Sequence, residues 1–181
     1  GAEAESEVIP VPLLKDINDH WAQANILKLV VSGVIGGDPD NTFKPDKTIT
    51  RAEFAAILVN AFDLNDCNGK VFTDTTRHWA REYIQRATAA GVVSGYADNT
   101  FDPEKLITRE EMAAMITRAV DLQPVEKETR FADSSDISAW AKEAIGLASV
   151  NGIIKGYPDN TIRPQGSATR AEAVTIIVNA M

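Results

Sequence analysis

Apolar positions along the chain follow a helical rhythm, and the same rhythm returns three times. In the first third of the chain, Ile26 and Val30 are four residues apart, and Phe54, Ile57 and Leu58 follow the same three-and-four spacing. The pattern predicts two helices in each repeat. We expect the first helices over residues 21–32, 79–90 and 140–150, and the second helices to begin after residues 50, 108 and 169. The sequence therefore predicts a mainly all-α fold of three helix-loop-helix repeats.

The second helix of each repeat carries a start signal. Thr-x-x-Glu stands directly ahead of the apolar run at residues 50–53, 108–111 and 169–172. In this capping box the Thr hydroxyl accepts from a first-turn amide, and the Glu reaches back to the cap amide. Each box predicts a helix that begins at the residue after the Thr.

The spacing of matching residues fixes the repeat boundaries. Trp21, Trp79 and Trp140 are 58 and 61 positions apart, and the same two intervals separate other matching residues. We expect a mobile tail over 1–12, repeats over 13–62, 71–120 and 130–181, and linkers over 63–70 and 121–129. Because two helices cannot bury their apolar faces alone, the second helices should form a central three-helix bundle with a pseudo-threefold, three-pronged shape, as one cooperative domain. A linear stack of helix pairs would use the same pattern.

Charge and composition exclude several kinds of partner. The net charge of the 181 residues is −8 and there is no basic stripe, so we expect no nucleic-acid partner. No apolar run approaches the roughly 18 residues of a membrane span, so no membrane insertion is expected. The single cysteine, Cys67, cannot form an intrachain disulfide, and low cysteine content fits both a cytosolic and a secreted protein.

No signal for catalysis, a cofactor or a metal emerges from the motifs. The stretch that begins at Asp38 resembles a calcium loop, but its sixth and twelfth positions hold Phe43 and Ile49 instead of Gly and Glu. There is no nucleophile elbow, phosphate loop or zinc spacing. The chain is therefore expected to be no enzyme and to need no cofactor.

An arginine sits in the first turn of every second helix. Arg51, Arg109 and Arg170 face the positive end of the helix dipole, which disfavours an exposed cation by about 0.3–1 kcal/mol. A helix start with a guanidinium fork can hold an anion, and the threefold occurrence favours that interpretation. The alternative is an arginine that pairs with a nearby carboxylate.

The complete pattern resembles the S-layer homology module in a tandem of three. Each copy runs Asp-(x)-Trp, an apolar helix, Gly-apolar-apolar-x-Gly, an Asp-Asn-Thr turn and then Thr-Arg-x-Glu, and the resemblance covers about 150 of the 181 residues. It implies a secreted, non-catalytic anchor at the bacterial cell wall or S-layer. Such modules bind secondary cell wall polysaccharide, commonly its terminal 4,6-pyruvate-ketal N-acetylmannosamine, in grooves between three prongs.

The resemblance also implies roles for twelve residues. The motif arginines would hold the pyruvate carboxylate, the opening aspartates would accept sugar hydroxyls or orient the groove, the tryptophans would face the sugar, and the turn glycines would let it approach the backbone. These residues are Arg51, Arg109, Arg170, Asp16, Asp74, Asp133, Trp21, Trp79, Trp140, Gly37, Gly95 and Gly156. The isolated fragment is expected to be monomeric.

Simpler interpretations stand beside these roles. The tryptophans could be packing residues of the core or first turn, and an N-cap or turn role is the stronger interpretation for the aspartates. A protein–protein repeat scaffold is the alternative function. The copies also differ: Asp38 stands where the others have Tyr96 and Tyr157, so we expect the three grooves to differ in affinity.

Overall fold

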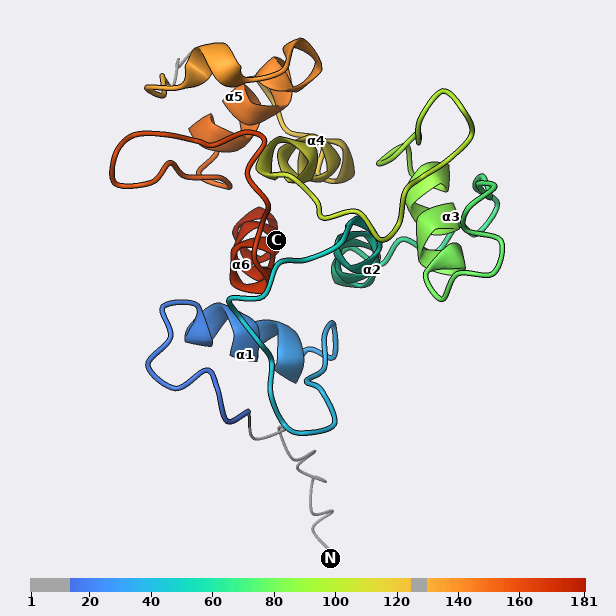
Figure 1. Cartoon of the computed structure of the whole chain (residues 1–181), viewed down its shortest axis with the longest axis horizontal. Helices are drawn as coiled ribbons and strands as arrows, with labels where there is room; N and C mark the ends of the chain where they lie inside the picture. Colours follow the sequence, from blue (N-terminus) through green and yellow to red (C-terminus); the bar gives the residue numbers. More distant parts are fainter. Residues whose placement is uncertain (1–13, 125–129) are drawn as a thin grey trace, which may run out of the picture.

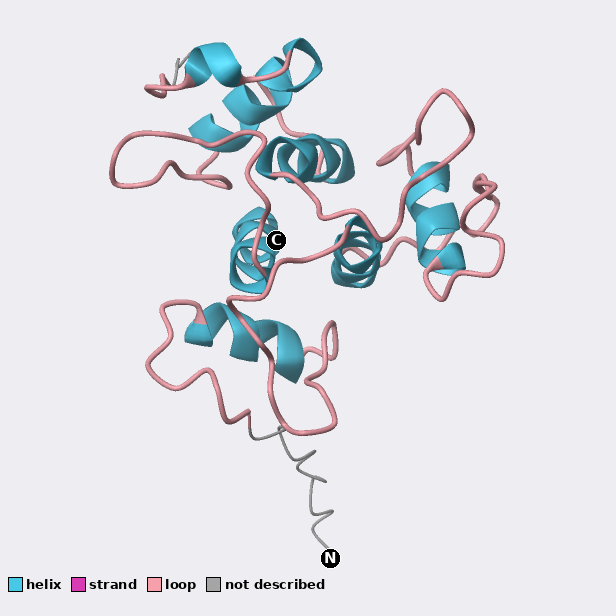
Figure 2. Ribbon diagram, viewed as in Figure 1, coloured by secondary structure: helices cyan, strands magenta, loops and turns pink. Residues whose placement is uncertain are grey.

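Six α-helices make up the described part of the protein. The computed structural model describes residues 14–124 and 130–181, so the expected N-terminal tail and most of the second linker lie outside the described residues. The helices are α1 (Gln23–Val31), α2 (Arg51–Ala61), α3 (Arg81–Ala89), α4 (Arg109–Ala119), α5 (Lys142–Val150) and α6 (Arg170–Ala180). Two 3-10 turns, η1 (Ser134–Asp136) and η2 (Ala139–Ala141), precede α5. The described residues form isolated bridges but no longer strand, which confirms the mainly helical prediction (Figure 2).

The second helices of the repeats occupy the centre of the molecule. Figure 1 shows α2, α4 and α6 around the middle of the body, with α1, α3 and α5 outside them. All three capping boxes are present: Thr50, Thr108 and Thr169 accept from the third helical amide, and Glu53, Glu111 and Glu172 accept from the cap amide. The predicted starts of these helices are therefore confirmed.

A closed cycle of backbone hydrogen bonds joins the segments that lead into the central helices. The amide of Ile49 donates to the carbonyl of Ala168 at 3.0 Å, that of Ala168 donates to Ile107 at 3.1 Å, and that of Ile107 donates to Ile49 at 3.0 Å. All three residues are fully buried. Because each of these bonds crosses between repeats, the cycle fixes the three helix starts relative to one another.

Each outer helix packs on the central helix of another repeat. Helix α3 lies against α2 and α5 against α4, so these outer helices contact the repeat that precedes them in the chain. Helix α1 has no preceding repeat and lies against α6, at the other end of the sequence. The first and last repeats are therefore neighbours in space.

The outer helices begin later than the apolar pattern predicts. They start two residues after Trp21, Trp79 and Trp140, because a separate turn precedes each helix. In two repeats a histidine holds this turn, since Nδ1 of His20 accepts from Ala22 N and Nδ1 of His78 accepts from Ala80 N. In the third repeat the 3-10 turn η2 stands in its place. The predicted glycine stops are confirmed, since Gly33, Gly91 and Gly152 follow the helices with φ of +77°, +74° and +70°.

Candidate ligand-binding grooves

The three motif arginines pair with the capping-box glutamates of neighbouring repeats. Nη1 of Arg51 donates to Glu111, and Nη1 of Arg109 donates to Glu172. Nη1 of Arg170 lies 2.9 Å from Oε2 of Glu53 in the first repeat, so the pairs run round the ring and close it. The interpretation of an arginine paired with a nearby carboxylate is confirmed at all three positions.

Within the described residues, the backbone donors at the starts of α2, α4 and α6 all have partners, so none is free for an anion. The amides of Arg51 and Ala52 donate to the carbonyls of Lys105 and Pro103, and the amide of Glu53 donates to Thr50 Oγ1. The corresponding amides of α4 and α6 have equivalent partners in the described loops. The backbone part of the predicted anion site is therefore wrong: a loop of the next repeat already occupies each helix start.

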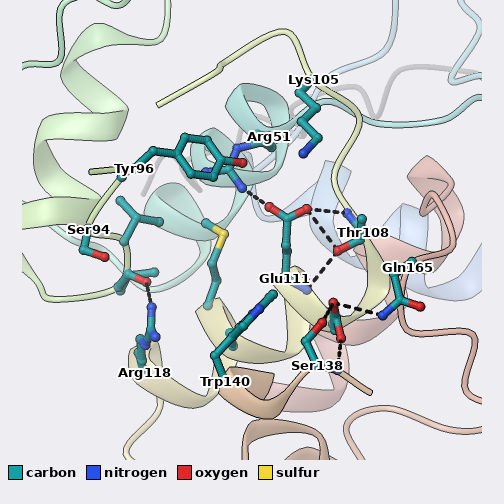
Figure 3. Close-up of a pocket in the computed structure, with 16 residues that line it drawn as sticks. Arg51, Ser94, Tyr96, Lys105, Thr108, Glu111, Arg118, Ser138, Trp140 and Gln165 are labelled. Carbon is teal, nitrogen blue, oxygen red and sulfur yellow. Dashed lines mark hydrogen bonds and ion pairs between the residues drawn. The ribbon is translucent and has the colours of Figure 1, made fainter. Parts of the chain in front are cut away.

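Arg51 lies in a cavity of about 560 Å³ built by all three repeats. The first repeat supplies Arg51, the second supplies Tyr96 and Glu111, and the third supplies Trp140. Cζ of Arg51 lies 5.0 Å from the centre of the Tyr96 ring. Figure 3 shows the arginine and Tyr96 together at one side of this cavity and Trp140 at another. We call it the Arg51 groove.

Two further cations line the Arg51 groove. Lys105 and Arg118 both face it, and Nη1 of Arg118 lies 3.4 Å from the carbonyl of Val92. Burial lowers the pKa of Arg51 from its ordinary value, but a guanidinium stays protonated in proteins. The predicted site residues did not include Lys105 and Arg118, because neither belongs to the repeated motif.

The Arg109 groove is the matching cavity one step round the ring. Its volume is about 660 Å³, and its lining includes Arg109 from the second repeat, Tyr157 and Glu172 from the third and Trp21 from the first. Cζ of Arg109 lies 4.5 Å from the centre of the Tyr157 ring, and the Tyr157 hydroxyl donates to Glu172 at 2.9 Å. The two grooves thus share an arginine, a tyrosine, a glutamate and a tryptophan.

Each of the three arginine–glutamate pairs marks one step of the ring of repeats. The third step, which we call the Arg170 position, has a different lining. Arg170 pairs with Glu53 there, and its Cζ lies 4.7 Å from the Phe43 ring, as Cζ of Arg51 does from the Phe101 ring. Trp79 lies in a cavity with Asn60, which is on the same helix as Glu53. Asp38 stands where the other repeats have tyrosine, and its Oδ2 lies 3.1 Å from Nζ of Lys44.

The tryptophans lie on the surface. Trp21, Trp79 and Trp140 are 64%, 59% and 58% exposed, so they are not core residues. Trp21 and Trp140 line the Arg109 and Arg51 grooves, and each comes from a different repeat than the arginine it faces. An exposed indole ring in a cavity is available to stack on a sugar or another flat ligand.

The opening aspartates hold the turn of their own repeat. Both carboxylate oxygens of Asp16 accept from backbone amides, those of Phe43 and Lys44, at 2.8 Å. Asp74 and Asp133 accept from two amides each in the same way. These contacts support the turn interpretation, and none of the three aspartates lines the Arg51 or Arg109 groove.

The turn glycines make room for a side chain of their own repeat. A Cβ on Gly95 would lie 2.2 Å from Cε1 of Phe72, and one on Gly37 would lie 2.5 Å from Leu14. A Cβ on Gly156 would come within 2.9 Å of Phe131. Gly95 and Gly156 also line the Arg51 and Arg109 grooves, so their backbone is accessible to a ligand there.

Buried Glu110 replaces a histidine contact in the third repeat. His20 and His78 contact Asp46 and Glu104 through Nε2, but the third repeat has no histidine. In place of that contact, Glu110 of the second repeat accepts from two residues of the third. Its side chain, which is 3% exposed, accepts from Ser138 N at 3.0 Å, from Ser138 Oγ at 2.7 Å and from Gln165 Nε2 at 3.2 Å. Ala52 and Ala171 occupy the matching positions of the other repeats, so these hydrogen bonds to a glutamate occur only at the Arg51 groove.

The described residues hold no cluster of His, Cys, Asp and Glu side chains suited to a metal ion. None of the helices in this part of the chain has the length and apolar character that crossing a membrane requires.

Comparison with known proteins agrees with the geometry of three linked repeats. The family model of the S-layer homology domain matches residues 13–55, 71–113 and 130–174. The chain belongs to the S-layer homology domain family. The S-layer homology domain anchors proteins to the cell wall, and relatives that are enzymes owe their activity to other domains, which confirms the predicted family and the coarser prediction of a cell-wall anchoring region in a secreted protein.

Several proteins share these domains with the chain. It is 37% identical over 169 residues to an amylopullulanase of Thermoanaerobacterium thermosulfurigenes, and the aligned region covers 90% of the chain and 9% of that protein. It is 32% identical over 180 residues to the surface-layer 125 kDa protein of Lysinibacillus sphaericus, 94% of the chain and 15% of that protein. It is 38% identical over 150 residues to a cellulosome-anchoring protein of Acetivibrio thermocellus, 78% of the chain and 34% of that protein. The chain thus spans about a third or less of the length of these relatives.

Proposed function

We propose that the chain is a carbohydrate-binding anchor for pyruvylated secondary cell wall polysaccharide. The ligand is the terminal 4,6-pyruvate-ketal N-acetylmannosamine, held in the grooves between repeats. The protein that carries the chain would thereby be attached to the cell wall or surface layer, with the repeats acting as a monomer. The observation that carries the proposal is the presence of a guanidinium and an exposed indole ring in one cavity, in both the Arg51 and the Arg109 grooves.

The Arg51 guanidinium keeps donors for a ligand despite its ion pair. An arginine has five N–H donors. Among the described residues, Arg51 uses Nε to donate to the Phe101 carbonyl and Nη1 to donate to Glu111. The Nη2 hydrogens and one Nη1 hydrogen remain for a carboxylate. Lys105 and Arg118 offset the charges of Glu110 and Glu111, so the groove as a whole is cationic.

The remaining lining suits a sugar ring. Sugar sites combine flat apolar surfaces with a few placed polar groups. Tyr96 and Trp140 supply aromatic surface in the Arg51 groove, while Ser94 and Gln165 supply hydroxyl and amide groups. Gly95 leaves the backbone open on the same side. The opening aspartates contribute by holding the turn that carries this glycine and tyrosine.

Calorimetric titration with the pyruvylated monosaccharide tests the proposal. We expect saturable binding, a loss of most of the affinity when the pyruvate is removed, and at least about tenfold weaker binding at the altered site in Trp140→Ala, because the stacking surface is lost. Val31→Ala is the matched control, since Val31 is 66% exposed and lies outside both grooves. Equal binding of the stripped sugar would refute the role of pyruvate. An absence of binding to any wall glycan would favour the protein–protein scaffold.

A further inference from the structure

One position of the repeat separates the Arg170 position from the two grooves. Residues 38, 96 and 157 match across the three repeats, and their amides make the same bond: Asp38 N, Tyr96 N and Tyr157 N each donate at 2.8 Å to the carbonyl of the threonine four residues later. The backbone at this position is therefore alike in the three copies, and only the side chain differs.

In the two grooves, this side chain is an aromatic ring that lies against the arginine. Cζ of Arg51 is 5.0 Å from the Tyr96 ring centre, and Cζ of Arg109 is 4.5 Å from the Tyr157 ring centre. A ring in this place provides apolar surface for a sugar next to the cation, and its hydroxyl adds a hydrogen-bonding group. It brings no negative charge at neutral pH.

At the Arg170 position the ring is replaced by a carboxylate. The Asp38 side chain is 43% exposed and takes up Lys44, the nearby cation, in an ion pair of 3.1 Å. Asn60 and Asn179 stand where the Arg51 groove has Arg118, so this cation is absent from both the Arg170 position and the Arg109 groove. A second acid, Glu53, already balances Arg170. What separates the Arg170 position from both grooves is therefore residue 38: it brings a carboxylate, paired with Lys44, in place of the tyrosine ring.

We propose that residue 38/96/157 decides which steps of the ring accept a carboxylate-bearing sugar, and that Asp38 excludes this sugar from the Arg170 position. The inference rests on the proposed function and deepens it: the chain holds two anionic-sugar sites, the Arg51 and Arg109 grooves. Like charges at close range repel, and the repulsion is not compensated by stacking on Asp38. A step with Asp38 binds the pyruvylated sugar at least about tenfold more weakly than a step with tyrosine.

The three tryptophans provide a separate reporter for each step. The chain has three tryptophans in all; Trp140 lies in the Arg51 groove, Trp21 in the Arg109 groove, and Trp79 beside Asn60, on the helix whose Glu53 pairs with Arg170. The full chain is labelled with 5-fluorotryptophan, and the three fluorine resonances are assigned with Trp→Phe variants. Titration with pyruvylated N-acetylmannosamine then gives a separate Kd for each step.

In the wild type, the Trp21 and Trp140 resonances should shift together, and the Trp79 resonance should shift only at concentrations at least about tenfold higher. Asp38→Tyr should bring the Kd at Trp79 close to the other two. Tyr96→Asp should weaken the response of Trp140 and leave that of Trp21 unchanged. Asp38→Asn, which removes the charge without adding a ring, should restore only part of the affinity.

Equal Kd values at all three tryptophans in the wild type would overturn the inference and leave the proposed function intact. The same holds if Asp38→Tyr folds with an unchanged melting temperature and Trp79 still fails to respond. A titration in which no tryptophan responds would overturn the proposed function, and the inference would fall with it.

Discussion

Nη1 of Arg170 lies 2.9 Å from Oε2 of Glu53, although 117 positions of sequence separate the two residues. The contact joins the last repeat to the first, and two equivalent contacts join the other neighbours. Each arginine sits at the unfavourable end of its own helix, and the glutamate of the next repeat supplies the missing negative charge. The repeated Thr-Arg-x-Glu motif therefore both caps a helix and links the repeats.

Neutralising Glu53 should destabilise the fold. Glu53→Gln keeps a side chain that can complete the capping box, but it leaves Arg170, whose side chain is 17% exposed, without its counter-charge. We expect a loss of about 1–3 kcal/mol in the free energy of unfolding. Urea denaturation measures it.

Asp38→Asn is the matched control for Glu53→Gln. It removes one carboxylate from an ion pair whose side chains are both nearly half exposed, so the expected loss is under about 1 kcal/mol. Equal losses in the two variants would show that the Arg170–Glu53 pair contributes no more than a surface contact.

Removal of one repeat should unfold the rest, as expected for one cooperative domain. A chain that ends at residue 124 lacks α6, so α1 loses its packing partner and two of the three inter-repeat ion pairs disappear. Circular dichroism should show no sharp thermal transition. A cooperative melt of the two-repeat fragment would mean that the repeats are stable as a linear stack.

Substitution of Gly95 should be much more costly than substitution of Gly91. Both residues have positive φ, +72° and +74°, so each Gly→Ala change carries a backbone penalty of about 1–2 kcal/mol. At Gly91 the new Cβ meets nothing within 4 Å, whereas at Gly95 it would lie 2.2 Å from Phe72. We expect Gly95→Ala to lose about 1–3 kcal/mol more than Gly91→Ala in urea denaturation. Equal losses would show that Phe72 moves aside freely.

Glu110→Ala should loosen the segment that carries Trp140. The change introduces the residue that the other two repeats have, but it leaves Ser138 without its side-chain acceptor and Gln165 with only the Asp136 carbonyl. We expect a loss of about 2 kcal/mol and a change in Trp140 fluorescence. Ala52→Ser is the control, because Ala52 is fully buried at the matching position of the first repeat. This substitution should leave the Trp140 emission unchanged. Unchanged emission in Glu110→Ala would contradict a positioning role.

Tyr157 should titrate late and make stability fall at high pH. Burial raises its pKa above the ordinary value of about 10, although Arg109 opposes the shift. The folded protein therefore keeps this proton where the unfolded chain has lost it. The resulting stability is complete below about pH 10 and declines as the pH rises through the raised pKa. Tyrosinate absorbance should show a late step that is absent in Tyr157→Phe; an identical titration of the two proteins would contradict the shift.

Local chemistry made the helix starts and stops predictable from sequence. A capping box is complete within four residues, and a glycine stop depends on one backbone conformation, so both are encoded where they act. The apolar spacing likewise identified helices. It placed the starts of the outer helices two residues early, because the turns that precede them are not part of an apolar pattern: a histidine holds the turn in two repeats, and η2 forms it in the third.

The composition of the grooves was beyond sequence reasoning because it depends on contacts between repeats. Arg51 meets Glu111 across 60 positions, and the same cavity takes Trp140 from a third repeat. Repeated motifs show which residues match between repeats, but they do not show which repeat supplies each side of a groove. The loops that cover the helix starts could not be predicted for the same reason. Nothing near Arg51 in the sequence indicates that its amide donates to the carbonyl of Lys105.

The packing of α1 against α6 has a mechanical consequence. Of the three seams between repeats, this one alone has no covalent linker across it, because the chain runs directly from the first repeat to the second and from the second to the third. A circular permutant that starts near residue 66 and joins the original termini with a flexible linker should retain the fold. When the chain is pulled from both ends, the force acts directly across this seam, so the contacts between the first and last repeats should break first.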